Sequence, residues 1–330
     1  MSHPRDVLLG SQAGKVILPV CDHYSGVEVR IQKSLALQSE MIDEFGACVF
    51  DATLDCEDGA PVGGEIDHIN MVVSIVNTAK LATKNVVKRI GVRVHPVGHA
   101  AFASDIELLV KGAGQHLAYI MLPKVERLYD VQTALQAINA AGGARIPLHV
   151  LIESSSAVHQ VFDIAAHARV ESVSFGLMDF VSSHSGAIPA DAMTSQGQFS
   201  HPLVLRAKTE IAAACHAHGK VPSHCVVTEF NDTDALHAAA QQASRKLGYS
   251  RMWSIHPAQI RPIIAAFAPS EGDIDTASRI IEAASSADWA PTSYLGQLHD
   301  RASYRYYWQV IERAQQTGRA LPGTMQAYFH

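Results

Sequence analysis

The chain has 330 residues, of which 48% are hydrophobic and 18% are charged, and its formal net charge is −6. This composition is ample for a packed core and leaves few residues for ion-pair surfaces. The negative charge and the lack of a long basic run argue against nucleic acid or an anionic membrane as the main partner. No apolar stretch is long enough to span a bilayer, and the first residues lack the apolar core of a secretion signal.

The five cysteines are scattered along the chain and form no Cys-x-x-Cys pair. An odd number of isolated cysteines is typical of reduced thiols in a reducing cytosol. The 18 histidines show no His-Glu-x-x-His spacing of the kind that binds zinc. We therefore expect a cytoplasmic protein.

Short apolar runs alternate with amphipathic stretches along most of the chain. Eight runs predict strands, at residues 15–20, 48–54, 90–94, 117–122, 148–152, 170–175, 222–227 and 252–255. The stretches between them predict helices, at residues 27–45, 68–82, 104–110, 125–141, 155–167, 202–218 and 232–247. Strands that alternate with helices indicate a mainly parallel sheet. The strand runs are apolar almost throughout, as in strands that are covered on both faces.

Eight such units favour an α/β fold of the (β/α)8 TIM-barrel type over an open doubly wound sheet. The first strand is not followed by a Gly-x-Gly-x-x-Gly turn, which weakens the dinucleotide-binding alternative. We expect residues 1–270 to form the barrel and residues 271–330 to form a C-terminal helical extension or lid, with helices at 273–286 and 303–317. The loop at 181–201 is the best candidate for a mobile flap over the site.

Two carboxylates carry the main functional prediction. Glu153 directly follows the fifth strand, and Asp179 comes shortly after the sixth. The carboxyl ends of parallel barrel strands form one rim, where barrel enzymes place their chemistry. Convergent oxygen ligands with room for water and substrate describe a magnesium site. On position alone, both residues are equally well read as acids in the first turn of a helix.

Two cations also fall at the predicted rim. Arg93 lies at the end of the third strand and needs an acidic partner, for which Glu57 or Asp58 after the second strand is the natural choice. We expect Arg93 to form this ion pair and also to bind a carboxylate or a developing oxyanion. We expect Lys124 to be a rim cation, because nearby acids oppose the lowered pKa that a Schiff-base lysine needs.

Three histidines fall near the rim. His95 and His224 are equally compatible with packing and with lining the site. His256 precedes Pro257, and this order favours a polar cap at the start of a helix.

These rim residues belong to a series of short motifs. The motifs are LDCEDGAP at 54–61, VRVH at 92–95, MLPKVE at 121–126, IES at 152–154, FGLMDF at 175–180, IHPAQI at 255–260 and YLGQLHD at 294–300. In this order, they resemble the citrate lyase β-subunit and malyl-CoA lyase family of the HpcH/HpaI aldolase superfamily. The similarity covers roughly residues 16–314.

The resemblance implies an Mg²⁺-dependent carbon–carbon lyase that cleaves or forms a β-hydroxyacyl-CoA-type thioester. Its products are a 2-oxo acid and an acyl thioester. The resemblance implies that Glu153 and Asp179 bind the metal and that Arg93 binds the oxygen of the oxo acid or of the enolate. It also implies a homo-trimer or homo-hexamer in which the C-terminal lid reaches a neighbouring subunit's site.

The remaining roles also come from the resemblance. Glu57 and Asp58 would orient Arg93 and ordered waters, and Asp300 would be the general acid/base supplied by the lid. Substrate contacts are expected from Arg93 and from the following residues: Lys124, Gly176, Leu177 and Met178.

Three positions depart from the family pattern, at Lys15, His95 and His224. They leave two alternatives open. One is an Mg²⁺-dependent aldolase that acts on free 4-hydroxy-2-oxo acids without a thioester. The other is a barrel paralogue that has lost catalysis.

Overall fold

The structure is a computed structural model that describes residues 3–10, 13, 17–79, 82–83 and 86–329. The chain divides into two compact units. Pro19–Phe267 forms the first, which we call the barrel unit. The described residues of Met1–Leu18 and Ala268–His330 form the second, which we call the C-terminal unit.

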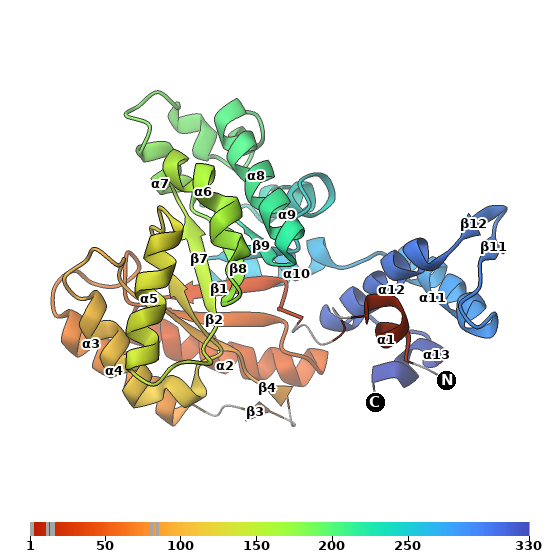
Figure 1. The fold of residues 1–330 in the computed structure, drawn as a ribbon, viewed down its shortest axis with the longest axis horizontal. Helices are drawn as coiled ribbons and strands as arrows, with labels where there is room; N and C mark the ends of the chain where they lie inside the picture. The colour runs from red at the N-terminus through yellow and green to blue at the C-terminus, as the bar shows by residue number, and fades with distance from the viewer. Residues whose placement is uncertain (1–2, 11–12, 14–16, 80–81, 84–85, 330) are drawn as a thin grey trace. The chain divides into compact units, whose positions relative to one another are not determined.

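The barrel unit is a closed barrel of eight parallel strands with helices between them, so the predicted (β/α)8 fold is confirmed (Figure 1). Around the barrel the strands follow the order β1-β10-β9-β8-β7-β6-β5-β2. Their bounds are β1 (Cys21–Ser25), β2 (Phe50–Asp55), β5 (Ile90–Arg93), β6 (Tyr119–Leu122), β7 (Leu148–Ile152), β8 (Val170–Phe175), β9 (Val221–His224) and β10 (Arg251–Ser254).

Helices cover the outside of the strands and bury the main apolar core between the two layers. Most of the predicted helices are present with bounds that shift by a few residues. The helices of the barrel unit are α2 (Glu28–Phe45), α3 (Glu65–Thr78), α4 (Phe102–Ala113), α5 (Leu128–Ala140), α6 (Ser155–Ala166), α7 (Leu177–Ser182), α8 (Pro202–His218), α9 (Thr233–Lys246) and α10 (Pro257–Phe267). A short antiparallel pair, β3 (Ala82–Thr83) and β4 (Val86–Val87), follows α3.

The prediction of the first strand was wrong. The strand is Cys21–Ser25 and not residues 15–20, of which Lys15 and residue 16 lie outside the described residues. A run that includes Asp22 did not look like a buried strand. Asp22 is nevertheless 1% exposed, because its Oδ1 accepts a hydrogen bond of 2.6 Å from the hydroxyl of Thr53 inside the barrel.

An ionic network fills the part of the barrel interior that lies away from the carboxyl ends of the strands. Arg251 is fully buried, and its Nη2 lies 2.6 Å from Oδ2 of Asp51 and 3.3 Å from Oδ2 of Asp22. Arg89 donates from Nε to the other oxygen of Asp51 at 2.9 Å. Buried charges of opposite sign that pair in this way offset part of their desolvation. The barrel is therefore filled partly by polar side chains below its rim.

The C-terminal unit has its own small core around Trp308 and Tyr304, which are both fully buried. Leu8 and Leu9 from the N-terminal helix belong to this core. Between the two helices predicted for this unit, the chain forms an antiparallel hairpin. The elements of this unit are α1 (Pro4–Leu9), α11 (Glu271–Ser286), β11 (Thr292–Tyr294), β12 (Gln297–His299), α12 (Arg301–Gln316) and α13 (Gly323–Gln326).

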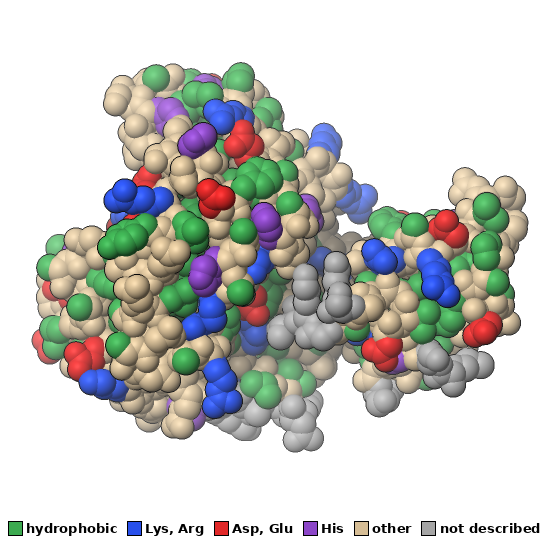
Figure 2. All heavy atoms as spheres, viewed as in Figure 1, with side chains coloured by type: hydrophobic (Ala, Val, Ile, Leu, Met, Phe, Trp, Pro, Cys, Tyr) green, Lys and Arg blue, Asp and Glu red, His purple; other side chains and the backbone are tan. Residues whose placement is uncertain are grey.

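Two features of the described residues bear on partners. None of their helices combines the length and the apolar character that a membrane crossing needs. On the face shown in Figure 2, lysine, arginine and acidic side chains are scattered among polar and apolar ones, without a continuous basic patch.

Candidate active site

A cavity of about 840 Å³ lies in the barrel unit, where the strands end. Its lining comes from the end of almost every strand and from the segments that follow. The residues are His23, Tyr24, Ser25, Gly26, Arg30, Lys33, Ser34, Asp55, Asp58, Gly59, Arg93, Glu153, Gly176, Leu177, Met178, Asp179, Val226, Thr228, Phe230, Trp253, Ile255, His256 and Pro257.

Glu153 and Asp179 both line this cavity. Glu153 directly follows β7 and is 4% exposed, and Asp179 lies in the first turn of α7. Burial, together with the negative charges of Asp179 and Glu57, raises the pKa of Glu153 to about 8. A buried carboxylate beside other acids is costly to ionise unless a cation neutralises it.

The backbone around Glu153 keeps its carboxylate in place. The N–H of Lys124 donates to Oε2 of Glu153 at 3.2 Å. A Cβ added to Gly176 would lie 2.6 Å from Oε1 of Glu153, so only glycine leaves room for the carboxylate there. The other oxygen therefore lies against bare backbone at the edge of the cavity.

These residues fit an Mg²⁺ ion. Their donors are carboxylate oxygens, which hard cations prefer. Within the described ranges, no group of three or more histidine, cysteine or acidic side chains is arranged to hold a metal. Mg²⁺ needs only one or two protein carboxylates, because water and substrate complete its coordination. Glu153 and Asp179 would hold the ion.

Arg93 is held by two carboxylates. Asp55 accepts hydrogen bonds from Nε at 2.7 Å and from Nη2 at 2.6 Å, and Glu57 lies 2.9 Å from Nη1. The guanidinium carbon also lies 5.4 Å from the ring centre of Tyr24 and 5.6 Å from that of Trp253. Although burial alone would lower the pKa of Arg93, Asp55 and Glu57 raise it above its usual value. Arg93 is therefore a fixed positive charge.

Lys124 contacts the acids that follow β2. Its Nζ donates to Oε1 of Glu57 at 2.6 Å and to Oδ2 of Asp58 at 3.2 Å. Burial lowers the pKa of Lys124, but Glu57 and Asp58 raise it by more than burial lowers it, so the pKa lies above its usual value. This lysine stays charged at neutral pH, which argues against a Schiff base.

The structure therefore brings together most of the predicted site residues. Glu57 pairs with Arg93, as expected, but Asp58 pairs with Lys124, and Asp55 is a further acid on Arg93. The cavity lining includes Gly176, Leu177 and Met178, as well as Arg93, Asp58 and the two proposed metal ligands, but not Lys124 or Glu57.

Asp300 belongs to the C-terminal unit. Its Oδ1 accepts hydrogen bonds from the backbone N–H of Ala302 at 2.9 Å and of Ser303 at 3.3 Å. It is therefore the N-cap of α12, where aspartate stabilises the start of a helix without any catalytic role. Its proposed catalytic role stays a prediction.

The N–H of Ala258 donates to Nδ1 of His256 at 3.3 Å, as expected for a polar cap, and packing is the role of the other two histidines. His224 is fully buried and stacks on Phe199, and Nδ1 of His95 lies 2.6 Å from Oδ2 of Asp105, which accepts its hydrogen bond. Neither is part of the cavity lining, which instead includes His256 and His23.

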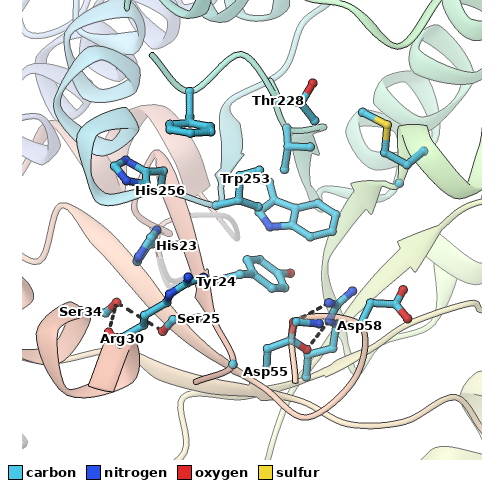
Figure 3. Close-up of a pocket in the computed structure, with 18 of the residues that line it drawn as sticks. His23, Tyr24, Ser25, Arg30, Ser34, Asp55, Asp58, Thr228, Trp253 and His256 are labelled. Carbon is cyan, nitrogen blue, oxygen red and sulfur yellow. Dashed lines mark hydrogen bonds and ion pairs between the residues drawn. The ribbon is translucent and has the colours of Figure 1, made fainter. Parts of the chain in front are cut away.

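Four residues of the cavity lining had no role in the prediction from the sequence: Asp55, His23, Tyr24 and Trp253. Asp55 stood in the acidic motif without a role. His23 and Tyr24 fell outside the predicted first strand, and Trp253 fell within the predicted last strand without an assigned role. Figure 3 shows His23, His256, Arg30 and Ser34 at one end of the cavity and Asp55 and Asp58 at the other.

A closed parallel barrel with a charged cavity at its rim defines a (β/α)8 enzyme. Residues 34–257 match the family model of the HpcH/HpaI aldolase/citrate lyase family, and the chain belongs to this family. The chain is 30% identical over 245 residues to the L-malyl-CoA/β-methylmalyl-CoA lyase of Rhodobacter capsulatus. The aligned region covers 69% of this chain and 77% of that protein. The predicted family and the lyase class are confirmed.

Solved structures of similar proteins agree with the barrel fold. A citrate lyase from Burkholderia xenovorans LB400 is 49% identical, with a TM-score of 0.82 and complete coverage of both chains. Protein CitE from Mycobacterium tuberculosis, solved with magnesium, acetoacetate and coenzyme A, is 20% identical, with a TM-score of 0.67 over 90% of this chain and 98% of that one. At this identity the second likeness shows the fold alone.

Proposed function

We propose that the chain is an Mg²⁺-dependent carbon–carbon lyase acting on a β-hydroxyacyl-CoA thioester, which it cleaves to a 2-oxo acid and an acyl-CoA, or forms by the reverse condensation. The main support is the Glu153 carboxylate, which is 4% exposed. Burial and the negative charge of the neighbouring Asp179 raise its pKa to about 8. Two neighbouring carboxylates repel each other, and a divalent cation bound between them would offset this repulsion.

The relatives point to the same substrate class. The similar enzymes of Rhodobacter capsulatus and Cereibacter sphaeroides are named as lyases of malyl-CoA and β-methylmalyl-CoA. A citrate lyase β-subunit of the same fold was solved with oxaloacetate and magnesium. Malyl-CoA and β-methylmalyl-CoA carry a thioester, and oxaloacetate is a 2-oxo acid. We assign to this chain a reaction that joins or separates these two kinds of fragment.

The residues of the cavity fit the charges of this reaction. When bound, Mg²⁺ would polarise the oxygens of the oxo-acid fragment. Carbon–carbon cleavage leaves an enolate on the thioester fragment, and its oxygen needs a fixed positive charge. Arg93 supplies that charge, because Asp55 and Glu57 hold its guanidinium in one orientation at the cavity wall. Asp58 and Lys124 stabilise this arrangement from the side.

Cleavage releases the proton of the β-hydroxyl and the enolate carbon gains one proton, so the two steps balance. We assign the delivery of the proton to the enolate carbon to Asp300 from the C-terminal unit of a neighbouring subunit. The assignment rests on the family resemblance of the segment 294–300. It predicts that Asp300→Asn lowers turnover far more than it weakens oxo-acid affinity, because the amide cannot transfer the proton. An unchanged rate would move this role to another residue.

The test is a coupled assay of acyl-CoA and oxo-acid pairs with and without Mg²⁺. Acetyl-CoA with glyoxylate tests the thioester reaction, and pyruvate with an aldehyde tests the free-acid aldolase reaction. We expect Mg²⁺-dependent turnover only in the first. Glu153→Gln should abolish it, while the control Glu107→Gln, an exposed residue of α4 that pairs with Lys111, should not. Turnover that is independent of Mg²⁺ would contradict the proposal.

A further inference from the structure

Two aromatic side chains form an inner wall of the cavity. Tyr24 is the next-to-last residue of β1, and Trp253 is the next-to-last residue of β10. They are 5% and 9% exposed, and their ring centres lie 4.4 Å apart. Both line the cavity that contains the acids of the proposed metal site. The pair is therefore placed to contact whatever enters the barrel.

Each of these side chains has a polar atom that lacks a partner. The hydroxyl of Tyr24 and Nε1 of Trp253 are buried and form no hydrogen bond with any residue that the structure describes. A buried polar group without a partner costs about 1 to 3 kcal/mol. Burial raises the pKa of Tyr24, so its hydroxyl keeps its proton and can donate. Phenylalanine would pack at either position without this penalty.

The pair lies deeper in the barrel than Asp55 and Arg93. Asp55 and Arg93 are the last residues of their strands, whereas Tyr24 and Trp253 each come one residue before the end. The guanidinium of Arg93 lies over both rings. In Figure 3, the Tyr24 ring lies alongside the Trp253 indole, and its hydroxyl is directed toward the Asp55 end of the cavity.

The size of the two substrate fragments decides which one reaches this wall. The thioester carries a long carrier that must leave through the mouth of the cavity. The oxo acid is small and has its carboxylate and oxo oxygen next to each other, where the metal end of the cavity would hold them. What remains to face the inner wall is the substituent on the far side of the oxo group.

We propose, on the basis of the proposed function, that Tyr24 and Trp253 select 2-oxo acids that carry a hydroxyl or another hydrogen-bonding oxygen on the carbon next to the oxo group. Such an oxygen satisfies the Tyr24 hydroxyl and the Trp253 N–H, whereas an alkyl group leaves both unpaired. A site that is built to hydrogen-bond a substrate oxygen discriminates strongly against the analogue that lacks it, while an apolar pocket does not.

The test uses two ligands of nearly equal shape, hydroxypyruvate and 2-oxobutyrate, which differ by a hydroxyl in place of a methyl group. Calorimetry measures their binding to the full-length protein with saturating Mg²⁺. The wild type should bind hydroxypyruvate at least about tenfold more tightly, as one buried hydrogen bond implies. Tyr24→Phe and Trp253→Phe should each lose most of this preference without weakening 2-oxobutyrate. The control Tyr129→Phe changes an exposed hydroxyl and should behave as wild type.

The outcomes separate the two proposals. If the wild type binds both oxo acids equally, or if Tyr24→Phe keeps the preference, the selection by Tyr24 and Trp253 is wrong while the lyase assignment stands. If neither oxo acid binds in the presence of Mg²⁺, the lyase assignment and the selection both fall. Tyr24→Leu adds a further arm. If Tyr24→Leu loses affinity for both ligands while Tyr24→Phe loses none, the ring of Tyr24 only supports Arg93 and the proposed selection is wrong.

Discussion

The carboxylate of Asp55 accepts two hydrogen bonds from the guanidinium of Arg93, at 2.7 Å from Nε and 2.6 Å from Nη2. The two residues end neighbouring parallel strands, β2 and β5, and are direct partners in the ladder register. Bidentate pairs of this kind fix the orientation of the guanidinium as well as its charge. Arg93 is thus oriented before substrate arrives, which is the property that charge stabilisation in a transition state requires.

Gly59→Ala tests this orientation without touching either charge. The N–H of Gly59 donates to Oδ2 of Asp55 at 2.9 Å, and an added Cβ would lie 2.1 Å from that oxygen. The carboxylate must move, so we expect lyase activity to fall at least about tenfold, and the free energy of unfolding to fall by about 1 to 3 kcal/mol as in overpacked sites. Gly98→Ala is the matched control, because a Cβ there meets no atom within 4 Å. Equal behaviour of the two variants would contradict the account.

Lys124 combines strain with a contact to a proposed metal ligand. Its φ of 50° lies in the left-handed region, where a side chain costs about 1 to 2 kcal/mol. Its backbone N–H donates to Glu153 at 3.2 Å. Lys124→Gly and Lys124→Met both remove the ammonium, but only glycine relieves the strain. We expect the glycine variant to have the higher free energy of unfolding, by about 1 kcal/mol, in denaturant titrations. If the methionine variant is as stable, the backbone at this position is not strained.

The sequence predicts the barrel well because its strands and helices have different periods of apolar residues. The bounds of β7, β8 and α8 agree with the prediction to the residue. The first strand failed for a physical reason: β1 lies where the barrel interior is polar, so its residues looked like a loop. The segment before it is more apolar, although its Ile17 is exposed.

The site could be predicted in part. Acids and an arginine at strand ends are visible in the sequence, because strand ends converge on one rim. Which acid pairs with which cation is not visible, since Asp55, Glu57 and Asp58 lie within four residues of one another. Register decides it by placing Asp55 beside Arg93. The inner wall of Tyr24 and Trp253 could not be predicted either, since it depends on the closure of β1 against β10.

His23 should make stability depend on pH. Burial, with a smaller effect of His256, lowers its pKa from 6.5 to about 4. Between these values the unfolded chain binds a proton that the folded protein does not, so stability falls as the pH decreases through this range. At pH 5 the loss relative to pH 7 should be about 2 kcal/mol from this residue.

Chemical unfolding at pH 7 and pH 5 measures this effect. His23→Gln should reduce the difference between the two pH values by about that amount, whatever it does to stability at pH 7. His159→Gln, which changes an exposed histidine of α6, is the control and should leave the difference unchanged. A pH dependence that is the same in His23→Gln and in the wild type would show that His23 is not a buried neutral imidazole.

The binding of Mg²⁺ to Glu153 and Asp179 is the claim on which the function depends, and titration calorimetry with Mg²⁺ in the presence of pyruvate tests it most directly. We predict a single Mg²⁺ site per chain in the wild type, and affinity reduced at least about tenfold in both Glu153→Gln and Asp179→Asn, because each loses a charged oxygen ligand. Circular dichroism spectra should be unchanged, since neither carboxylate supports the barrel core. Undiminished Mg²⁺ binding in either variant would contradict the account.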